Sequence, residues 1–196
     1  MAPRSYNNAR RKESEAQTLD RIVDATISLH ARQGAVATSH AQIADLAGVS
    51  VATVYKHFPT KEALLPHCIG KVTGQAPAID ADAILAEPDL ESRLRLLVEK
   101  VFARYRYFHP WIRWTPVDAP TLPAVAEAGN AGAREVEALA RSIIAGVGRD
   151  LPEERAALVA MIISYPSWQT LEQSLSSPER ANDAALLALR LFLSHP

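Results

Sequence analysis

Apolar side chains recur every three or four positions along most of the chain, which is the spacing of one face of an α-helix. The first such run covers residues 14–32 and has charged side chains between its apolar positions. Gly34 is placed to end this helix, because glycine accepts the left-handed conformation that follows a last helical turn. The apolar positions of the run are Leu19, Ile22, Val23, Ile27 and Leu29.

Three shorter segments after Gly34 carry signals for the start and end of a helix. Ser39 is placed to cap a second helix, because its hydroxyl accepts hydrogen bonds from free backbone N–H groups. This helix is expected to end at Gly48. A third helix is expected over residues 50–58, and Pro59 stops it. Thr60 is placed to cap a fourth helix that begins at the next residue.

Pro66 lies five residues into the fourth helix and leaves two possibilities. Proline has no N–H to bond the carbonyl of Glu62, and its ring crowds that turn. The helix therefore either ends near Leu65 or continues with a kink. Because Ile69 and Val72 continue the apolar period, the pattern favours a kinked but continuous helix.

Every strong pattern in the rest of the chain is also helical. A long apolar stripe runs from residue 90 to 108, and a proline-rich aromatic stretch over 109–123 predicts short, broken helices. A further helix is expected to pass through residues 136–147 and end around the glycines at 146–148. Two last helices are expected over 152–175 and 178–194. The chain shows no alternation typical of β-strands, which predicts an all-α fold of about nine helices.

Composition is that of an ordinary globular protein, but charge is unevenly distributed. The 196 residues carry a net charge of −1 and one cysteine, Cys68. Residues 1–61 carry eight bases and five acids, a net +3, whereas the remainder has 13 bases and 17 acids, a net −4. This asymmetry suits a DNA-binding segment attached to an acidic body. Neither a secretory signal nor a membrane-spanning run is apparent, so a cytoplasmic location is expected.

Residues 43–58 have the spacing of a helix-turn-helix. Ala44 supplies the small side chain needed where two helices cross closely, and Gly48 supplies a residue that tolerates positive φ in the turn. Val54 and Phe58 are one turn apart and are expected to face the first helix. The positions left pointing outward are Val51, Ala52, Thr53, Tyr55, Lys56 and His57. Small, hydroxyl and basic residues on an exposed helix suit the major groove of DNA.

The longer segment 38–65 closely resembles the DNA-binding signature of the tetracycline-repressor (TetR) family. The residues that carry the resemblance are Thr38, Ile43-Ala44, Ala47-Gly48-Val49-Ser50, Thr53-Val54-Tyr55, His57-Phe58, Lys61-Glu62 and Leu64-Leu65. The resemblance implies a DNA-binding domain over residues 1–60 and a larger helical domain over 61–196 for ligand binding and dimerisation. The domain boundary is expected within residues 60–76.

The resemblance also implies roles for individual side chains. Thr53, Tyr55 and Lys61 fall at positions that contact phosphates, and Lys61 begins a helix, where an anion is favoured. The positions expected to approach base edges or nearby phosphates are Ser50, Val51, Ala52, Lys56 and His57, and Ser39 joins the DNA-contacting set.

Two departures from the family pattern limit direct base readout. Ala41 stands where a basic residue is common, and Val51-Ala52 offer methyl groups but no hydrogen bonds. Readout then relies more on thymine methyls, on Lys56 and on the basic arm that holds Arg4, Arg10, Arg11 and Lys12. The alternative for this arm is a disordered tail that aids solubility.

Two further sets of residues are candidates for binding in the second domain. The aromatic and polar side chains that could line a pocket for a small apolar or aromatic ligand are Phe102, Tyr105, Arg106, His109, Trp111, Trp114, Met161, Tyr165 and Trp168. Such stripes also occur as plain core. The side chains expected to form a homodimer seam in the last two helices are Leu158, Ile162, Leu171, Leu175, Leu186, Leu189 and Phe192.

The sequence offers no catalytic set. It holds no zinc-type ligand motif and no glycine-rich phosphate loop, and its six histidines are scattered. We therefore expect no metal, no cofactor and no enzyme activity. The interpretation is a homodimeric transcription regulator, expected to be a repressor that a small apolar molecule releases from a near-palindromic operator. The alternatives are a constitutive DNA-binding regulator without a ligand and a helical enzyme or ligand-storage protein.

Overall fold

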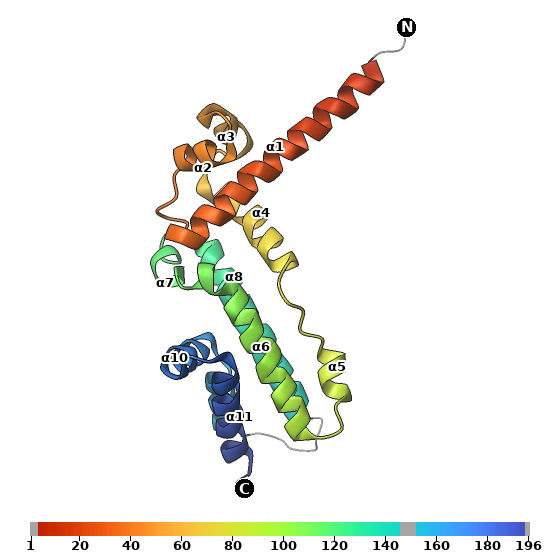
Figure 1. The fold of residues 1–196 in the computed structure, drawn as a ribbon, viewed down its shortest axis with the longest axis vertical. Helices are drawn as coiled ribbons and strands as arrows, with labels where there is room; N and C mark the ends of the chain where they lie inside the picture. Colours follow the sequence, from red (N-terminus) through yellow and green to blue (C-terminus); the bar gives the residue numbers. More distant parts are fainter. Residues whose placement is uncertain (1–3, 146–151, 195–196) are drawn as a thin grey trace. The chain divides into compact units, whose positions relative to one another are not determined.

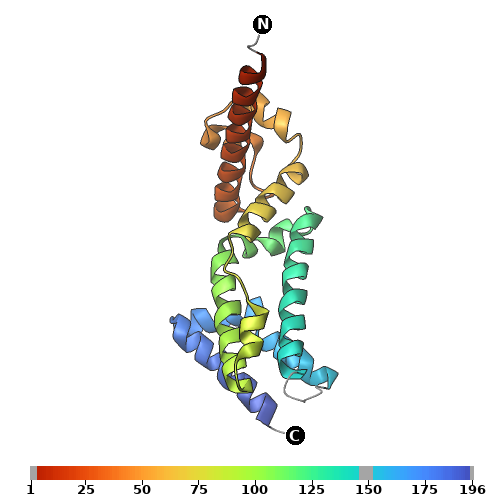
Figure 2. The same cartoon turned by 90° about the vertical axis from the view of Figure 1, so that its right-hand side faces the viewer.

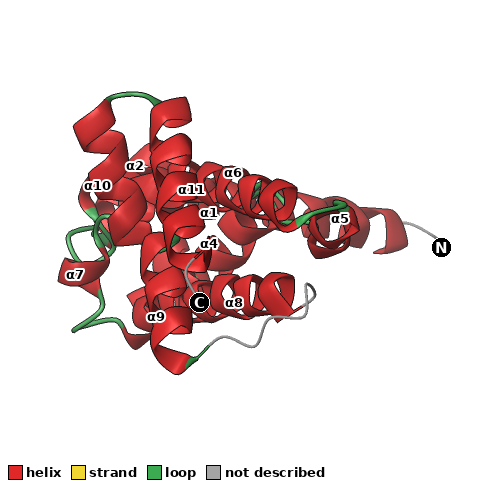
Figure 3. Ribbon diagram, turned by 90° about the horizontal axis from the view of Figure 1, so that it is seen from below, coloured by secondary structure: helices red, strands yellow, loops and turns green. Residues whose placement is uncertain are grey.

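The computed structural model describes residues 4–145 and 152–194, and these residues form eleven helices without a strand (Figure 1, Figure 3). The helices are α1 (Arg4–Gln33), α2 (His40–Ala47), α3 (Val51–His57), α4 (Lys61–Gly74), α5 (Ala81–Ala86), α6 (Leu90–Ile112), α7 (Thr115–Asp118), α8 (Pro123–Ala145), α9 (Glu153–Ile162), α10 (Tyr165–Leu175) and α11 (Pro178–Ser194). The all-α prediction is confirmed, although about nine helices were expected. The predicted helix end at 146–148, with Val147, lies outside the described residues.

Packing divides the chain into two units. Unit 1 holds residues 1–75 and 110–129, and unit 2 holds residues 76–109 and 130–196. Helices α6 and α8 belong to both units, because each crosses one of these divisions. Unit 1 thus extends beyond residue 60 and takes in a second, distant segment. The predicted division into a DNA-binding domain over 1–60 and a ligand-binding and dimerisation domain over 61–196 concerns function, and it stays a prediction.

Unit 1 is built on α1, against which α2, α3 and α4 pack (Figure 1). Its core forms where the apolar stripe of α1 meets the inner faces of the short helices. The buried members are Ile22, Val23, Ala25, Leu29, Ile43, Ala44, Ala47, Val54, Phe58, Leu64 and Cys68. Helix α1 begins at Arg4 rather than at residue 14, so the basic arm is helical rather than a disordered tail.

Helix α4 settles the question raised by Pro66. The helix is continuous from Lys61 to Gly74 with Pro66 inside it, so the alternative of an early end near Leu65 is wrong. The apolar period explains the continuation, since Leu64, Leu65, Cys68 and Val72 are all buried. Burial of this face stabilises the helix enough to offset the hydrogen bond that proline removes.

Unit 2 has its own core, to which α5, α6, α8, α9, α10 and α11 all contribute. Helix α5, which the sequence pattern did not reveal, lies beside the first half of α6 (Figure 1, Figure 2). The largest fully buried side chains of this core are Ile84, Leu97, Phe102, Ile143, Ile144, Ile163 and Leu189.

The segment 152–175, expected to be one helix, is two. Helix α9 ends at Ile162, and α10 begins at Tyr165 after a cap by Ser164, which accepts the N–H of Ser167 at 3.4 Å. Pro166 follows in the first turn, where its missing N–H costs nothing. A serine cap followed by this proline is therefore the local cause of the break.

Candidate functional site

The turn between α2 and α3 is fixed by caps on both sides. Ser39 accepts the N–H of Gln42 at 3.2 Å, while the Gln42 side chain accepts the N–H of Ser39 at 2.9 Å. Gly48 ends α2 in the left-handed region with φ 64°. Ser50 caps α3 by accepting the N–H of Thr53 at 3.1 Å. The predicted cap at Ser39 and the predicted helix end at Gly48 are confirmed, whereas the cap by Ser50 was not predicted. Gly48 and Ser50 set the sharp angle of a helix-turn-helix.

Helix α3 has one face in the core and the other in solvent, as its sequence predicts. Val54 and the following Phe58 are buried, and Ala44 of α2 is buried with them. Val51 and Tyr55 are 41% and 51% exposed despite their apolar surface. Among the other outward positions, Ala52 and Lys56 are exposed, whereas Thr53 and His57 are half-buried. This exposed strip carries the small, hydroxyl and basic side chains that suit a DNA groove.

Tyr55 is held in place by a residue that the sequence did not single out. Its ring stacks on the ring of His40, with centroids 4.3 Å apart and planes 6° from parallel. His40 is buried at the start of α2, and its Nε2 lies 2.9 Å from the carbonyl oxygen of Phe58. Because a carbonyl only accepts, this nitrogen carries the proton and donates. The stack restricts Tyr55 to one orientation with its outer side in solvent.

Two lysines near the exposed strip have different surroundings. Lys56 is exposed and 3.8 Å from the carboxylate of Glu15, an ion pair that solvent weakens. Lys61 is half-buried and donates from Nζ to the carbonyl oxygen of Val36. Thr60 caps α4 by accepting the N–H of Ala63 at 3.3 Å. Lys61 therefore contributes to internal structure, which the sequence did not predict.

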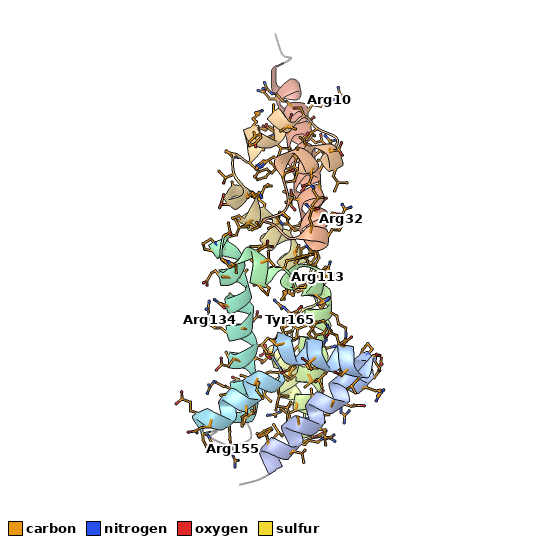
Figure 4. All side chains as sticks on the ribbon, turned by 90° about the vertical axis from the view of Figure 1, so that its left-hand side faces the viewer. Arg10, Arg32, Arg113, Arg134, Arg155 and Tyr165 are labelled. Atoms are coloured by element: carbon orange, nitrogen blue, oxygen red, sulfur yellow. The ribbon has the colours of Figure 1, made fainter. Side chains whose placement is uncertain are left out.

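The basic arm forms the first turns of α1. This end of α1 extends past α2 and α3, and Arg10 lies on it (Figure 1, Figure 4). The side chains of Arg10, Arg11 and Lys12 are exposed. Consecutive positions on a helix point in different directions, so these bases surround the helix rather than form a single row.

The geometry agrees with comparisons to known proteins. A profile described as "Bacterial regulatory proteins, tetR family" matches residues 22–68, the stretch from the middle of α1 to α4. A TetR-family regulator from Mesorhizobium loti superposes with a TM-score of 0.68 over 92% of this chain and 96% of that one, at 19% identity. A transcriptional regulator from Rhodococcus sp. Rha1 gives 0.64 over 89% and 95%, at 22% identity. Residues 22–68 thus match the tetR-family profile, and the described residues share the fold of these solved regulators.

The curated relatives of this chain are helix-turn-helix regulators. The HTH-type transcriptional regulator LuxR of Vibrio harveyi is 29% identical over 111 residues, which is 54% of each protein. The HTH-type transcriptional repressor KstR of Mycolicibacterium smegmatis is 32% identical over 89 residues, 45% of this chain and 44% of that protein. The chain thus matches about half the length of these relatives, all of which are regulators rather than enzymes.

Most of the predicted ligand residues form an aromatic cluster in unit 2. Tyr105 donates its hydroxyl to the carbonyl of Ile163 at 3.1 Å, and burial raises the pKa of Tyr105 to about 12. His109 Nδ1 lies 2.8 Å from the hydroxyl of Tyr165, which Figure 4 shows at the start of α10. Trp168 packs on these three rings, with centroids 5.4 to 6.1 Å away. Phe102 is buried behind them, whereas Met161 is exposed.

A cavity of about 250 Å³ adjoins this cluster. The residues that line it are Arg106, His109, Trp168, Gln169, Glu172 and Gln173. Arg106 makes a two-pronged ion pair with Glu172, at 2.8 and 2.9 Å, and also donates to Asn182. Trp168 is 3% exposed, and its indole N–H lacks a hydrogen-bond partner among the described residues. A buried donor without a partner is unfavourable, so this indole N–H is an unsatisfied group beside the cavity.

Trp111 and Trp114, also predicted to line a pocket, belong to unit 1. The indole N–H of Trp111 donates to the carbonyl of Ile27 at 3.0 Å, and that of Trp114 donates to the carbonyl of Ala31 at 3.2 Å. Arg113, labelled in Figure 4, donates to the same Ala31 carbonyl at 2.9 Å. Both indole N–H groups are therefore used to hold α1, so they are not part of the aromatic cluster of unit 2.

The predicted seam residues divide between core and surface. Ile162, Leu186 and Leu189 are buried in the core of unit 2 itself, and the half-buried members are Leu158, Leu171 and Leu175. Phe192 is exposed, as are Leu187 at 54% and Leu191 at 57%, neither of which was predicted. The exposed apolar side chains of α11 are thus Leu187, Leu191 and Phe192, whereas the predicted Leu186 and Leu189 face the core of unit 2.

Two other classes of site find no support in the part of the chain that is described. No three histidine, cysteine or acidic side chains among those residues come together as a metal site would require. No helix there is both long enough and apolar enough to cross a membrane.

Proposed function

We propose that this protein is a transcription regulator that binds duplex DNA through α3. The observation that carries the proposal is the exposed strip of α3, held from behind by Val54 and Phe58 and fixed at its start by the Ser50 cap. The relatives named above are regulators, which supports the same function. A short, rigid helix with small and basic outward side chains is the element that fits a major groove.

The proposed contacts follow the chemistry of each side chain. Tyr55 and Thr53 bind phosphates through their hydroxyls, and Lys61 binds one through its ammonium group. That group has three N–H donors, of which one already bonds Val36, so donors remain for DNA. The side chains of Val51 and Ala52 contact thymine methyls, while Lys56 and His57 reach base edges or nearby phosphates. The hydroxyls of Ser39 and Ser50 lie at the exposed starts of α2 and α3.

We propose that the regulator acts as a homodimer. Two copies present two α3 helices, which requires a near-palindromic operator with half-sites spaced by the helical repeat of DNA. The exposed side chains Leu187, Leu191 and Phe192 on α11 support a seam along that helix, since exposed apolar side chains that recur on one helix face favour association. Leu158, Leu171 and Leu175, half-buried in the protomer, lie at the proposed edge of this seam.

We propose further that a small apolar or aromatic molecule releases the protein from DNA, which makes it a repressor. The cavity beside Trp168 supports this, because it adjoins the aromatic cluster and its polar lining side chains could orient a ligand. DNA and ligand would then bind different conformers. Each would weaken the binding of the other by the same factor.

The DNA contacts are tested by the salt dependence of binding. A duplex selected from a random-sequence pool serves as the probe, and affinity is measured at several salt concentrations. Tyr55→Ala should weaken binding to all sequences with little change in the slope of log K against log salt, because its hydroxyl is neutral. Lys56→Ala removes a positive charge and should lower that slope by about one unit. Val51→Ser should instead change which sequence is selected.

Lys56→Ala and Lys100→Ala form a matched pair for the same test. Each removes one lysine that pairs with a glutamate, but Lys56 lies on α3, whereas Lys100 lies on α6 in unit 2. Only the α3 variant should weaken binding. Equal effects of the two substitutions, or unchanged affinity in Tyr55→Ala, would show that α3 is not the DNA-binding surface.

A further inference from the structure

The loop that leads from α1 into the helix-turn-helix is held at both backbone polar groups of one residue, Val36. The N–H of Ala35 donates to Asp118 Oδ2 at 2.8 Å, and the N–H of Val36 donates to Oδ1 at 2.9 Å. The carbonyl of the same Val36 accepts the ammonium group of Lys61. Asp118 comes from α7 and Lys61 from the start of α4, so two elements fix the loop three residues before the cap of α2.

The surroundings of Asp118 leave space for its carboxylate. Asp118 is 4% exposed, and a buried charge is tolerated only where it is hydrogen-bonded. Gly34 precedes the loop with φ 83°, and a Cβ at that position would lie 3.1 Å from both oxygens of Asp118. The residue that ends α1 is therefore also the one that leaves room for the carboxylate.

A nearby histidine does not supply a balancing charge. Burial lowers the pKa of His30 to about 4, with the Asp118 charge opposing this shift and the Lys61 charge adding to it. His30 is thus neutral near pH 7. The carboxylate of Asp118 is stabilised instead by the two backbone N–H groups of the loop, which makes their position depend directly on that of Asp118.

The bonds of Asp118 continue a series made by residues 111–118, here called the anchor segment. Its earlier members Trp111, Arg113 and Trp114 donate to carbonyls in the last turns of α1. The anchor segment begins at the end of α6, two residues after His109, which lines the cavity of unit 2. Pro110 lies between them inside the helix and removes one backbone hydrogen bond there.

We propose that Asp118 is a positioning residue for DNA binding: it sets the loop 35–37 and thereby the placement of α2 and α3 on α1. The proposal rests on the DNA-binding function proposed above. Asp118 is buried in unit 1, and its carboxylate bonds two backbone N–H groups of the loop, which are separate from the exposed strip of α3. Its loss therefore changes where the DNA-binding side chains stand, and leaves the number of phosphate contacts unaltered.

Asp118→Asn is the decisive variant, because the amide keeps the shape of the carboxylate but turns an N–H donor toward one of the loop's N–H groups. Binding to the selected duplex should weaken about tenfold. The slope of log K against log salt should stay at the wild-type value, unlike that of Lys56→Ala. Asp80→Asn is the control, since Asp80 caps α5 in unit 2 by accepting one backbone N–H at 3.0 Å.

Trp114→Phe provides a second, milder variant should Asp118→Asn fail to fold. It removes one indole N–H bond to α1 and should weaken DNA binding about threefold, again without a change in slope. Wild-type affinity in both variants would overturn the proposal. So would a loss of affinity in Asp80→Asn equal to that in Asp118→Asn, because the effect would then come from general destabilisation.

Amide hydrogen exchange separates this proposal from the proposed function. Asp118→Asn should speed exchange at Ala35 and Val36 and throughout α2 and α3, but not in unit 2. If the wild-type protein binds no duplex, the proposed function fails while the exchange data still test the role of Asp118. Unchanged exchange in α2 and α3 would overturn that role whatever the DNA result.

Discussion

Two glycines of unit 1 adopt left-handed backbone conformations, but they differ in their surroundings. A Cβ on Gly34 would lie 3.1 Å from the Asp118 carboxylate, whereas a Cβ on Gly48 would meet nothing closer than 4.0 Å. Gly48→Ala should therefore lower the free energy of unfolding only by the backbone cost, about 1–2 kcal/mol. Gly34→Ala adds crowding and should cost roughly 2–4 kcal/mol. Urea unfolding measures both, and equal losses would mean that Asp118 moves away freely.

His30 should make the stability of the protein depend on pH. Its pKa falls from 6.5 to about 4 on folding because burial disfavours the charged form. Between these values the unfolded chain binds the extra proton, so the free energy of unfolding decreases as pH falls from about 6.5 to about 4. By about pH 4 the free energy of unfolding has decreased by about 3 kcal/mol because of this residue. Above about pH 6.5 His30 causes no decrease.

His30→Gln isolates this contribution, because glutamine does not titrate. The difference between wild type and variant in urea unfolding, measured from pH 4 to 7, should shrink or change sign as pH falls. Other groups that titrate affect both proteins alike and cancel from the difference. A difference that stays constant across this range would contradict the buried, neutral state of His30.

At the scale of elements, the first and last residues of the short helices could be predicted from the sequence, because the interactions that start and stop these helices are local. The caps by Ser39, Ser50 and Thr60 and the glycine turn at Gly48 each involve residues within four positions of one another. The inward and outward faces of α3 followed from periodicity for the same reason. Most of the proposed DNA-binding surface could therefore be predicted from the sequence.

Other elements left weak signals or none. The first ten residues of α1 carry no apolar period, so hydrophobic spacing could not reveal that they are helical. The break between α9 and α10 did have a signal, the cap at Ser164 followed by Pro166, which the apolar run obscured. The bonds of Trp111 and Asp118 join residues more than 80 positions apart, and no local pattern encodes such pairs.

The continuous α4 allows a test of Pro66 as a soft point between DNA and ligand binding. Pro66→Ala restores the hydrogen bond to Glu62 and should straighten the helix while leaving DNA binding measurable. It should change the factor by which an inducer weakens operator binding, as measured in paired titrations. Gly70→Ala is the control, since it strengthens the same helix where no neighbour lies within 4 Å. Equal coupling in all three proteins would exclude a role for Pro66.

At the scale of the whole molecule, the proposed dimer depends on the exposed stripe of α11. Leu191→Glu places a charge where a partner helix would cover the side chain, so it should yield monomers in sedimentation velocity. Val117→Glu, at a side chain 62% exposed in unit 1, should leave the dimer intact. A wild-type chain that sediments as a monomer at tens of micromolar would rule out the seam.

The membership of residues 110–129 in unit 1 matters for protein engineering. A hybrid regulator joins the DNA-binding domain of one protein to the ligand-binding domain of another. The junction is placed where the N-terminal, continuous part of the DNA-binding domain ends. A junction after residue 75 of this chain would leave behind Trp111, Trp114 and Asp118, the partners of α1 and its loop. A hybrid that also receives residues 111–118 should bind the operator of this protein. In a hybrid without them, α1 and the loop before α2 would lose these hydrogen bonds, so α2 and α3 would be held less firmly.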